Sequence, residues 1–341
     1  MDLDLSAAFN GPHTLEVEVH DEARQIGRVA LRVWVQKGMT ERLAALEAAA
    51  KTLPAGPRAS VRYPADYISK VNRGLVEMGT FDLGRELNAA EAVASAASRA
   101  VDPFAERRGD FKRHHLLPSA GEILPYRVYV PKAYDGTRAA PLVVALHGLG
   151  ATEDSFFDAY GRNLPRLAEE RGYLVVAPLG YRVDGFYGSG IGAMIDPAAE
   201  RTRQLSEQDV MAVLMRMRED YKVDDRRVYL LGHSMGAIGA WHLAAKYPER
   251  WAAVAAFAGT GPPASVARMK DIPQFVVHGD ADPTVSVSGS RGMVAEMRKL
   301  GVDVRYIEVP GGNHIDVVVP HLDGAFDFFD THAKGTPATR R

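Results

Sequence analysis

From about residue 111 onward, short apolar segments of β-strand character alternate with amphipathic helical patterns. Such alternation leaves few architectures open, because strands joined by helical crossovers form a mostly parallel sheet with helices on both faces. The segments predicted as strands are Phe111–Leu117, Ile123–Val130, Leu142–Leu146, Tyr173–Ala177, Val228–Leu231, Ala253–Phe257, Gln274–Val277 and Val304–Val309. Only the short Pro118–Gly121 turn separates the first two. We therefore expect an α/β fold in which an antiparallel hairpin leads into the parallel part of an eight-stranded sheet.

Two helical patterns between these strands are the clearest. One is predicted to begin at Ser206, whose hydroxyl can cap a helix with Asp209 three residues further on. The other begins just after Ser234 and ends at Tyr247, because Pro248 cannot continue a helix. Apolar residues recur at helical spacing in both, so each helix is expected to bury one face against the sheet.

Residues 1 to about 110 show a different pattern, with two short strands followed by an Ala-rich helical region. The strands are predicted at Thr14–Val19 and Val29–Val35, and the helices at Thr40–Leu53, Ala65–Met78 and Asn88–Val101. Asn88 and Glu91 match a capping box at the start of the third helix. We expect a mainly helical N-terminal extension over residues 1–110 that packs on the body, an α/β domain over residues 111–334, and a tail over residues 335–341.

The composition excludes several kinds of chemistry. With no Cys among 341 residues, the chain has no disulfide, no zinc-thiolate site and no cysteine nucleophile. A formal charge of −2 without a long Lys/Arg run gives no electrostatic basis for binding nucleic acid or an anionic membrane. A small-molecule substrate is therefore favoured, and no motif indicates a metal or a cofactor.

The first residues, MDLDLSAAFN, lack the basic and apolar regions of a signal peptide, and no apolar run reaches the roughly 18 residues of a membrane-spanning helix. We therefore expect a soluble chain. A signal peptide that had been removed would leave the same sequence, so secretion and the periplasm stay open as locations. The oligomeric state stays open too.

A G-x-S-x-G sequence runs from Gly232 to Gly236, directly after a predicted strand and at the start of a predicted helix. This context is typical of a nucleophile elbow, in which a serine is exposed on a tight strand-to-helix turn and glycines leave room for the backbone. Alone, such a sequence is as often an ordinary glycine-rich turn. Its flanking strand and helix favour Ser234 as a nucleophile.

A second motif, His147-Gly148-Leu149-Gly150, follows the predicted strand at 142–146. In a sheet of this kind such a loop supplies one backbone N–H to an oxyanion hole, and the residue after the nucleophile supplies the other. The predicted donors are the N–H groups of Leu149 and Met235. His147 is interpreted as a structural residue that braces the loop.

Two further strand ends provide an acid and a base. The sequence HGDADPTV at 278–285 contains two carboxylates. Asp282, three positions after the glycine in an HGxxDxxV arrangement, is predicted to orient a histidine, and Asp280 is predicted to cap the turn. The last strand leads into GGNH at 311–314, and of eleven histidines only His314 occurs in the order and context of a general base.

Residues from about 111 to 332 resemble bacterial esterases of the α/β-hydrolase superfamily, in the group described as prolyl-oligopeptidase-like, feruloyl-esterase-like or polyhydroxybutyrate-depolymerase-like. The resemblance is carried by LHGLG at 146–150, VYLLGHSMGAIGAWHLAAKYPERWAA at 228–253, HGDADPTV at 278–285 and GGNH at 311–314. It implies a serine esterase that acts through an acyl-enzyme, with Ser234, His314 and Asp282 as the triad. The thiol-dependent dienelactone-hydrolase variant of the fold is excluded.

The glycine-rich stretch at 181–192 is too long for a simple connection and leaves the fourth strand at its carboxyl end, where open α/β sheets bind ligands. Phe186 and Tyr187 are therefore candidates for the wall of a substrate pocket. The alternative is that they pack the loop onto the body. No Lys follows the glycines as in a phosphate-binding loop.

Two other functions compete with ester hydrolysis. The same triad serves in serine peptidases and amidases, but prolyl oligopeptidases carry a large N-terminal propeller that about 110 residues cannot build. A non-catalytic binding protein on this fold would have no need of a complete triad and both oxyanion positions. The sequence therefore favours a carboxylic ester hydrolase, and it leaves the acyl and alcohol groups of the substrate undefined.

Overall fold

The computed structural model describes residues 6–22, 24–77, 81–99, 102–190 and 197–335, without the side chains of residues 197 and 198. The chain divides into two compact units, Met1–Glu106 and Arg107–Arg341. The predicted tail at 335–341 lies outside the described residues except for its first position.

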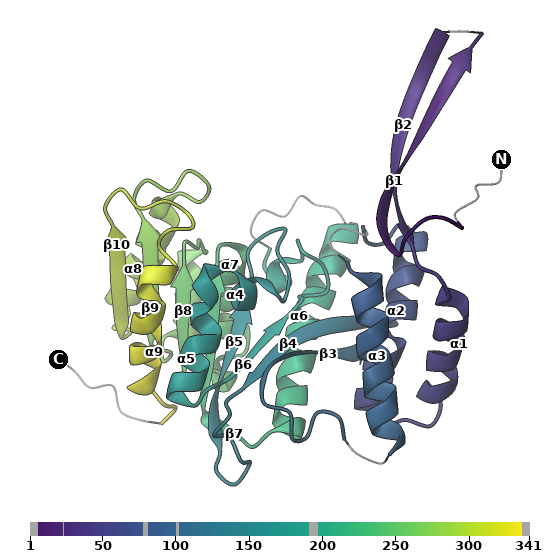
Figure 1. The fold of residues 1–341 in the computed structure, drawn as a ribbon. Coiled ribbons are helices and arrows are strands. Elements are labelled where there is room, and N and C mark those ends of the chain that lie inside the picture. The colour runs from purple at the N-terminus through teal and green to yellow at the C-terminus, as the bar shows by residue number, and fades with distance from the viewer. Residues whose placement is uncertain (1–5, 23, 78–80, 100–101, 191–196, 336–341) are drawn as a thin grey trace. The chain divides into compact units, whose positions relative to one another are not determined.

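Within the described residues, the second unit contains one eight-stranded sheet (Figure 1). Its strands are β3 (Gly109–Leu117), β4 (Glu122–Val130), β5 (Ala140–Leu146), β6 (Leu174–Pro178), β7 (Val223–His233), β8 (Ala253–Phe257), β9 (Gln274–Gly279) and β10 (Val304–Val309). They are ordered β10-β9-β8-β7-β5-β6-β4-β3. Strands β5 to β10 run parallel, and the β3–β4 hairpin joins β6 antiparallel. The predicted fold class and the antiparallel hairpin are confirmed.

The central strands form where the sequence is most continuously apolar. All seven residues of β5 are buried, as expected for a parallel strand covered on both faces. Strand β7 begins at Val223, earlier than predicted, because its first residue pairs with Ala140 of β5 before the charged stretch at 224–227. The charged residues at 224–227 interrupt the apolar pattern, so hydrophobicity alone does not predict the pairing of Val223 with Ala140.

Helices cover both faces of this sheet, and Figure 1 shows α5 and α9 in front of it with α6 behind. The α-helices are α4 (Ser155–Asp158), α5 (Asn163–Arg171), α6 (Pro197–Asp220), α7 (Met235–Lys246), α8 (Val287–Lys299) and α9 (Leu322–Asp330). The 3₁₀ turns are η1 (Tyr160–Arg162), η2 (Phe186–Gly188), η3 (Pro248–Arg250), η4 (Pro263–Met269) and η5 (Val319–His321). Helix α7 begins directly after Ser234, as predicted.

The predicted start of a helix at Ser206 is wrong. Helix α6 already begins at Pro197, and a proline is favourable in the first turn because its missing N–H would have no partner there. Ser206 is fully buried inside the helix, where its Oγ accepts a hydrogen bond from the amide of Tyr187. The local sequence around Ser206 is the same whether its hydroxyl caps a helix or accepts a hydrogen bond from another segment, so the sequence alone does not distinguish the two roles.

On one side of the sheet, aromatic side chains pack among Ala, Val and Leu residues. Phe326 and Phe329 of α9 pack on Tyr173 and Tyr229, and the Phe329 and Tyr229 rings stack with centroids 4.5 Å apart. The Tyr229 hydroxyl donates to the Phe329 carbonyl at 2.9 Å. This rigid core fixes the strand ends from which the loops of the site emerge.

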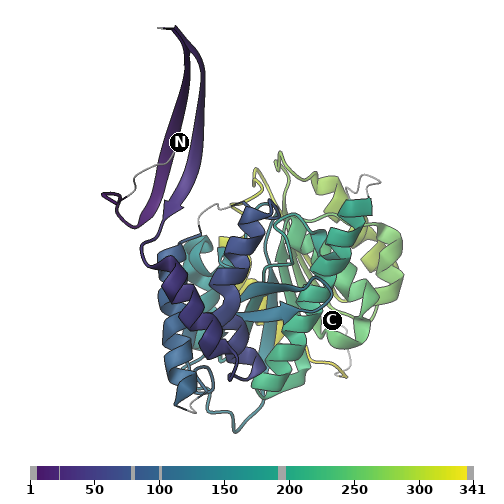
Figure 2. The ribbon, with the colours of Figure 1, turned by 90° about the vertical axis from the view of Figure 1, so that its right-hand side faces the viewer.

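The first unit consists of a hairpin, β1 (Gly11–Asp21) and β2 (Arg24–Val35), and three helices, α1 (Met39–Ala50), α2 (Ala55–Asn72) and α3 (Leu83–Ser98), within its described residues. Figure 2 shows β1 and β2 as a long two-stranded ribbon. Their register pairs Leu15 with Leu31 and Val17 with Val29. The helices pack around buried residues such as Leu87 and Val61.

Two predictions for this unit are wrong in detail. Helix α2 begins at Ala55 and passes through Pro64, because Val61 and Tyr63 on the earlier turns are buried and stabilise the helix there. The cap of α3 is Asp82, which accepts a hydrogen bond from the amide of Arg85 at 2.9 Å. Asn88 therefore lies inside α3. The helix predicted over Ala65–Met78 also ends too late, because α2 ends at Asn72 and residues 73–77 are not helical. Met78 itself and Val101, the predicted end of the third helix, lie outside the described residues.

Among the described helices, none combines the length and the apolar character needed to cross a bilayer.

Candidate active site

Ser234 occupies a strained turn between β7 and α7. Its backbone has φ 57° and ψ −120°, a conformation that a non-glycine residue adopts only where its surroundings enforce it. The flanking glycines are required sterically: a Cβ on Gly232 would overlap the carbonyl of Gly236, and a Cβ on Gly236 would overlap that of Leu146. This close approach of β7, α7 and β5 presents the serine side chain at the carboxyl end of the sheet.

The structure brings together the three side chains that the sequence selected. Nε2 of His314, on the loop after β10, lies 2.8 Å from Oγ of Ser234. Nδ1 of the same ring lies 2.7 Å from Oδ2 of Asp282, which follows β9. With a neutral imidazole, the serine hydroxyl donates to Nε2 and Nδ1–H donates to the carboxylate. The arrangement can remove the serine proton and stabilise the resulting imidazolium.

The environment of Asp282 keeps its carboxylate ionised. The side chain is fully buried, and Oδ1 accepts from the amides of Thr284 at 2.8 Å and Val285 at 2.9 Å. Burial is the largest influence and raises the pKa, but the hydrogen bonds from His314 and from these amides outweigh it, so the pKa of Asp282 lies below its ordinary value. Asp280 instead accepts from the amide of Gly311 at 2.6 Å and holds the turn before the base.

A second imidazole adjoins the same carboxylate. Nε2 of the fully buried His278 lies 3.2 Å from Oδ2 of Asp282 and 2.9 Å from the carbonyl of Val285. Its Nδ1 is 2.7 Å from Oγ of Ser290, which donates to the carbonyl of Gly259. His278 was not among the residues predicted from the sequence, although its place directly before Gly279 at a strand end is a usable signal.

His233, the variable residue of the serine motif, was also missed. It is buried, with Nε2 2.8 Å from the carbonyl of His314 and Nδ1 2.9 Å from the hydroxyl of Tyr160. Burial is the main cause that lowers the pKa of His233 to about 4, so the ring is neutral at pH 7.

The loop with the predicted oxyanion donor passes beside the serine. A Cβ built on Gly148 would lie 3.5 Å from Cβ of Ser234. Met235 is the first residue of α7, where amides have no acceptor within the helix and the helix dipole favours negative charge. Leu149 follows Gly148, and its side chain is 60% exposed. His147 is buried, and its Nε2 lies 2.7 Å from the carbonyl of Leu179, consistent with a bracing role.

For Tyr187 the structure favours the packing alternative over a pocket wall. Its side chain is fully buried, and its hydroxyl donates to the carbonyl of His147 at 3.1 Å. Phe186 is partly exposed and remains a candidate for the pocket. The loop is held at its start by the buried Asp209, which accepts from the amides of Gly180 at 2.7 Å and Tyr181 at 3.0 Å.

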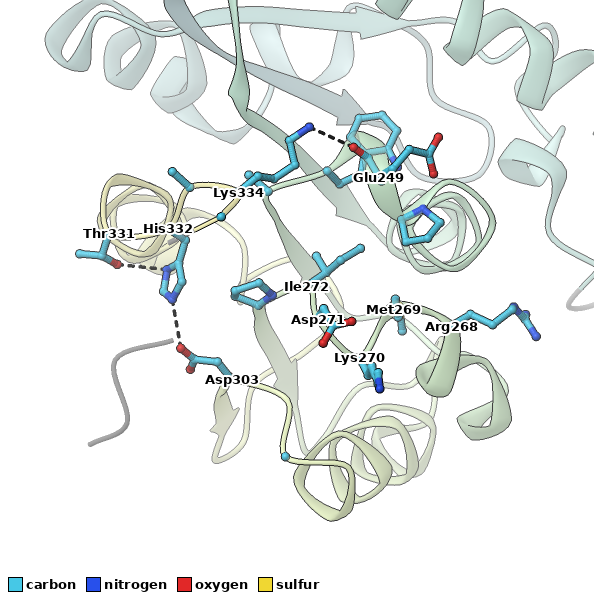
Figure 3. A pocket seen from close by; sticks show the side chains of 17 residues that line it. Glu249, Arg268, Met269, Lys270, Asp271, Ile272, Asp303, Thr331, His332 and Lys334 are labelled. Carbon is cyan, nitrogen blue, oxygen red and sulfur yellow. Dashed lines mark hydrogen bonds and ion pairs between the residues drawn. The ribbon is translucent and has the colours of Figure 1, made fainter. Parts of the chain in front are cut away.

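A cavity of about 630 Å³ lies at the opposite end of the strands (Figure 3). Ile272 and Asp303, which precede β9 and β10, line it, and Asp303 accepts from Nε2 of His332 at 3.1 Å. Ser234 follows the carboxyl end of β7, so this cavity is separate from the serine site. Within the described residues, no group of three or more His, Asp or Glu side chains is arranged to hold a metal ion.

The mixed sheet, the strained serine turn and the Ser–His–Asp arrangement after β7, β9 and β10 define a protein of the α/β-hydrolase superfamily. The chain belongs to the Esterase family, described as "Putative esterase", whose model matches residues 119–291. That range includes Ser234 and Asp282, and His314 follows it.

Individual relatives cover parts of the chain. It is 30% identical over 131 residues to feruloyl esterase B of Neurospora crassa, which is 38% of this chain and 42% of that protein. It is 27% identical over 203 residues to dipeptidyl-peptidase 5 of Porphyromonas gingivalis, which is 57% of this chain and 28% of that protein. The structure of a thermostable esterase superposes with a TM-score of 0.56 at 28% identity, over 66% of this chain and 63% of that one. The chain thus spans less than half of the length of these two curated relatives.

Proposed function

We propose that this protein is a serine carboxylic ester hydrolase that forms an acyl-enzyme on Ser234. The observation that carries the proposal is the continuous chain from Oγ of Ser234 to Nε2 of His314 at 2.8 Å and from Nδ1 to Asp282 at 2.7 Å. Membership of the Esterase family and the likeness to a thermostable esterase support it.

In this mechanism Oγ of Ser234 attacks the ester carbonyl carbon while Nε2 of His314 takes the serine proton. The carbonyl oxygen becomes an oxyanion, which the N–H groups of Leu149 and Met235 would stabilise, each by about 2.7–4 kcal/mol. The C–O bond to the alcohol then breaks, and the imidazolium gives its proton to the leaving alkoxide. A water molecule, deprotonated by His314, then attacks the acyl-enzyme carbonyl; the bond to Oγ of Ser234 breaks, the imidazolium returns its proton to Oγ, and the carboxylic acid leaves.

The surface around the serine favours an apolar group on the substrate. Leu149 on the oxyanion loop and Ile315 beside the base are 60% and 53% exposed. Val183 is 38% exposed, and its carbonyl accepts from the amide of Gly150 at 2.9 Å, which places the loop after β6 next to the oxyanion loop. Exposed aliphatic side chains on three adjoining loops would be covered by an alkyl or aryl part of the ester.

Peptide hydrolysis by the same triad is the second candidate, and the likeness to a dipeptidyl peptidase favours it. A panel of p-nitrophenyl acetate, butyrate and octanoate against peptide p-nitroanilides decides between the two. We expect kcat/KM to be larger for the esters and to rise from acetate to butyrate. Turnover of an anilide with kcat/KM above that of every ester would contradict the ester proposal, and the Ser234→Ala variant measures the background.

A further inference from the structure

His233 joins the two parts of the site that must stay in register, the serine turn and the loop that carries the base. It is the last residue of β7 and directly precedes Ser234. Its side chain is only 3% exposed and reaches across to the backbone of His314, 81 residues away in the sequence. His233, which has no part in the proposed mechanism, therefore connects the segment that carries Ser234 to the segment that carries His314.

The directions of its hydrogen bonds follow from the chemistry of the partners. The carbonyl of His314 only accepts, so Nε2 of His233 carries the proton and donates across 2.8 Å. Nδ1 is then the acceptor, and the hydroxyl of Tyr160 donates to it across 2.9 Å. One ring proton satisfies both contacts, so the neutral ring with its proton on Nε2 is the form that fits the site.

Tyr160 is itself held in place. Its backbone has φ 52°, which is unfavourable for a tyrosine and persists only where packing enforces it. Its ring packs on the buried Phe156 with centroids 5.1 Å apart and meets the His233 ring edge to face. The His233 ring in turn lies 4.8 Å from the ring of His314. Ring contacts thus connect Tyr160 of the α4–η1 segment to His233, and His233 to His314.

We propose that His233 is a positioning residue for His314: its Nε2–H holds the carbonyl of the base loop against the serine turn and so sets the distance between Nε2 of His314 and Oγ of Ser234. The inference rests on the proposed role of the triad. The turn Gly311-Gly312-Asn313 before the base is held on the side of the β9 loop, by the bonds from the Gly311 amide to Asp280 and from the Ala281 amide to the Gly312 carbonyl. Asp282 contacts Nδ1 of the His314 ring from the same loop, whereas the bond from His233 ties the backbone of His314 to the serine turn. A displacement of about 1 Å at this point can cost about 100-fold in rate.

Three variants of the full chain separate positioning from stability. His233→Leu removes the donor at similar volume, His233→Gln can offer an amide N–H near the place of Nε2, and Tyr160→Phe removes only the hydroxyl that fixes the tautomer. For each, kcat and KM with p-nitrophenyl acetate are measured per labelled site. The rate at which a fluorophosphonate labels Ser234 and the melting temperature are measured beside them.

We expect His233→Leu to lower kcat and the labelling rate about 10- to 100-fold, with KM changed by no more than about twofold. His233→Gln should recover about fivefold or more of that loss, and Tyr160→Phe should lie between His233→Leu and wild type. Loss of stability alone would not lower kcat while leaving KM unchanged. It would also not explain a recovery of kcat when Gln replaces Leu at position 233.

The proposal is overturned if kcat and labelling of His233→Leu stay within about twofold of wild type, or if Gln restores nothing. Should His233→Leu fail to fold, Tyr160→Phe decides: a lower labelling rate at an unchanged melting temperature supports positioning, and an unchanged rate overturns it. Failure of the proposed function looks different, because wild type itself would then hydrolyse no ester. The labelling rates of the variants still test the position of His314 in that case.

Discussion

Asp282 is surrounded by hydrogen-bond donors. It contacts His314 at 2.7 Å and His278 at 3.2 Å, and it accepts from the amides of Thr284 and Val285. Such a carboxylate stays ionised and holds the base in one tautomer, with Nδ1 protonated and Nε2 free to accept a proton. Asp280, two residues away, accepts instead from the amide of Gly311 in the turn before His314.

The two aspartates therefore predict opposite results on substitution. Asp282→Asn should lower kcat by about 10⁴-fold, because the amide favours the wrong tautomer of His314. Asp280→Asn should lower kcat by no more than about fivefold, since it only weakens the hold on the turn. Steady-state kinetics of the two variants check this, with melting temperatures as the control. A severe loss in Asp280→Asn together with a mild one in Asp282→Asn would move the acid to position 280.

The sequence selects the three side chains that the structure brings together, but not the histidines around them. Ser234, Asp282 and His314 each stand in a local pattern that ties a residue type to the end of a strand. His233 becomes a functional candidate through its contact with the carbonyl of His314, which no local pattern records. Tyr187 illustrates the same limit, since an aromatic residue on a pocket loop and one that packs the loop look alike in sequence.

The carboxylate of Glu207 links helix α6 to helix α7 and to the residue that follows α7. Glu207 of α6 accepts hydrogen bonds from the side chains of Lys246 and Tyr247, each at 2.6 Å, and contacts His242 at 2.8 Å. Burial raises its pKa, but these hydrogen bonds outweigh that effect and lower the pKa of Glu207 from 4.5 to about 2. Because the serine turn lies at the other end of α7, this cluster anchors the helix that follows Ser234.

The lowered pKa predicts how stability depends on pH. A carboxylate whose pKa is lower in the folded state stabilises the fold fully above its unfolded value of 4.5, and the contribution is lost as the pH falls towards about 2. The urea midpoint of wild type should therefore fall more between pH 5 and pH 3 than that of Glu207→Gln. Urea titrations of both proteins at the two pH values provide the check. Equal decreases in the two midpoints would exclude this role of Glu207.

At the level of elements, apolar runs predict strands well because parallel strands buried on both faces need uninterrupted hydrophobic residues, as in β5. Helix starts are predicted less well. Ser206 and Asn88 have the residue types of caps, yet both lie inside helices. The hydroxyl of Ser206 accepts a hydrogen bond from the amide of Tyr187, and Asp82 caps the helix that contains Asn88. The first of these bonds is a tertiary contact and the second comes from a competing residue nearby. A single local motif therefore does not show which candidate residue caps the helix.

For the whole molecule, we propose that the N-terminal unit, Met1–Glu106, packs on the catalytic unit and influences access to it. Its three helices have a small core, and an Ala-rich segment of this size has marginal stability alone. The proposal concerns both stability and substrate size, so a single truncation tests both.

A chain that begins at Arg107 keeps β3 and the whole sheet. We expect it to melt at least about 5 °C lower than the full chain and to change the ratio of octanoate to acetate ester hydrolysis. The measurements are thermal unfolding and kcat/KM on the two esters. A truncated chain with the same melting temperature and the same ratio would show that the unit neither packs on the body nor limits access.

The central claim is that an ester acylates Ser234, and trapping the acyl-enzyme tests it most directly. Wild type and Ser234→Ala are mixed with p-nitrophenyl butyrate, quenched in acid within milliseconds, digested and analysed by mass spectrometry. We expect a butyryl group on the peptide that contains Ser234, a burst of p-nitrophenol that precedes steady turnover, and neither in Ser234→Ala. Butyryl transfer to a different residue, or a Ser234→Ala variant that retains more than about a tenth of wild-type turnover, would contradict it.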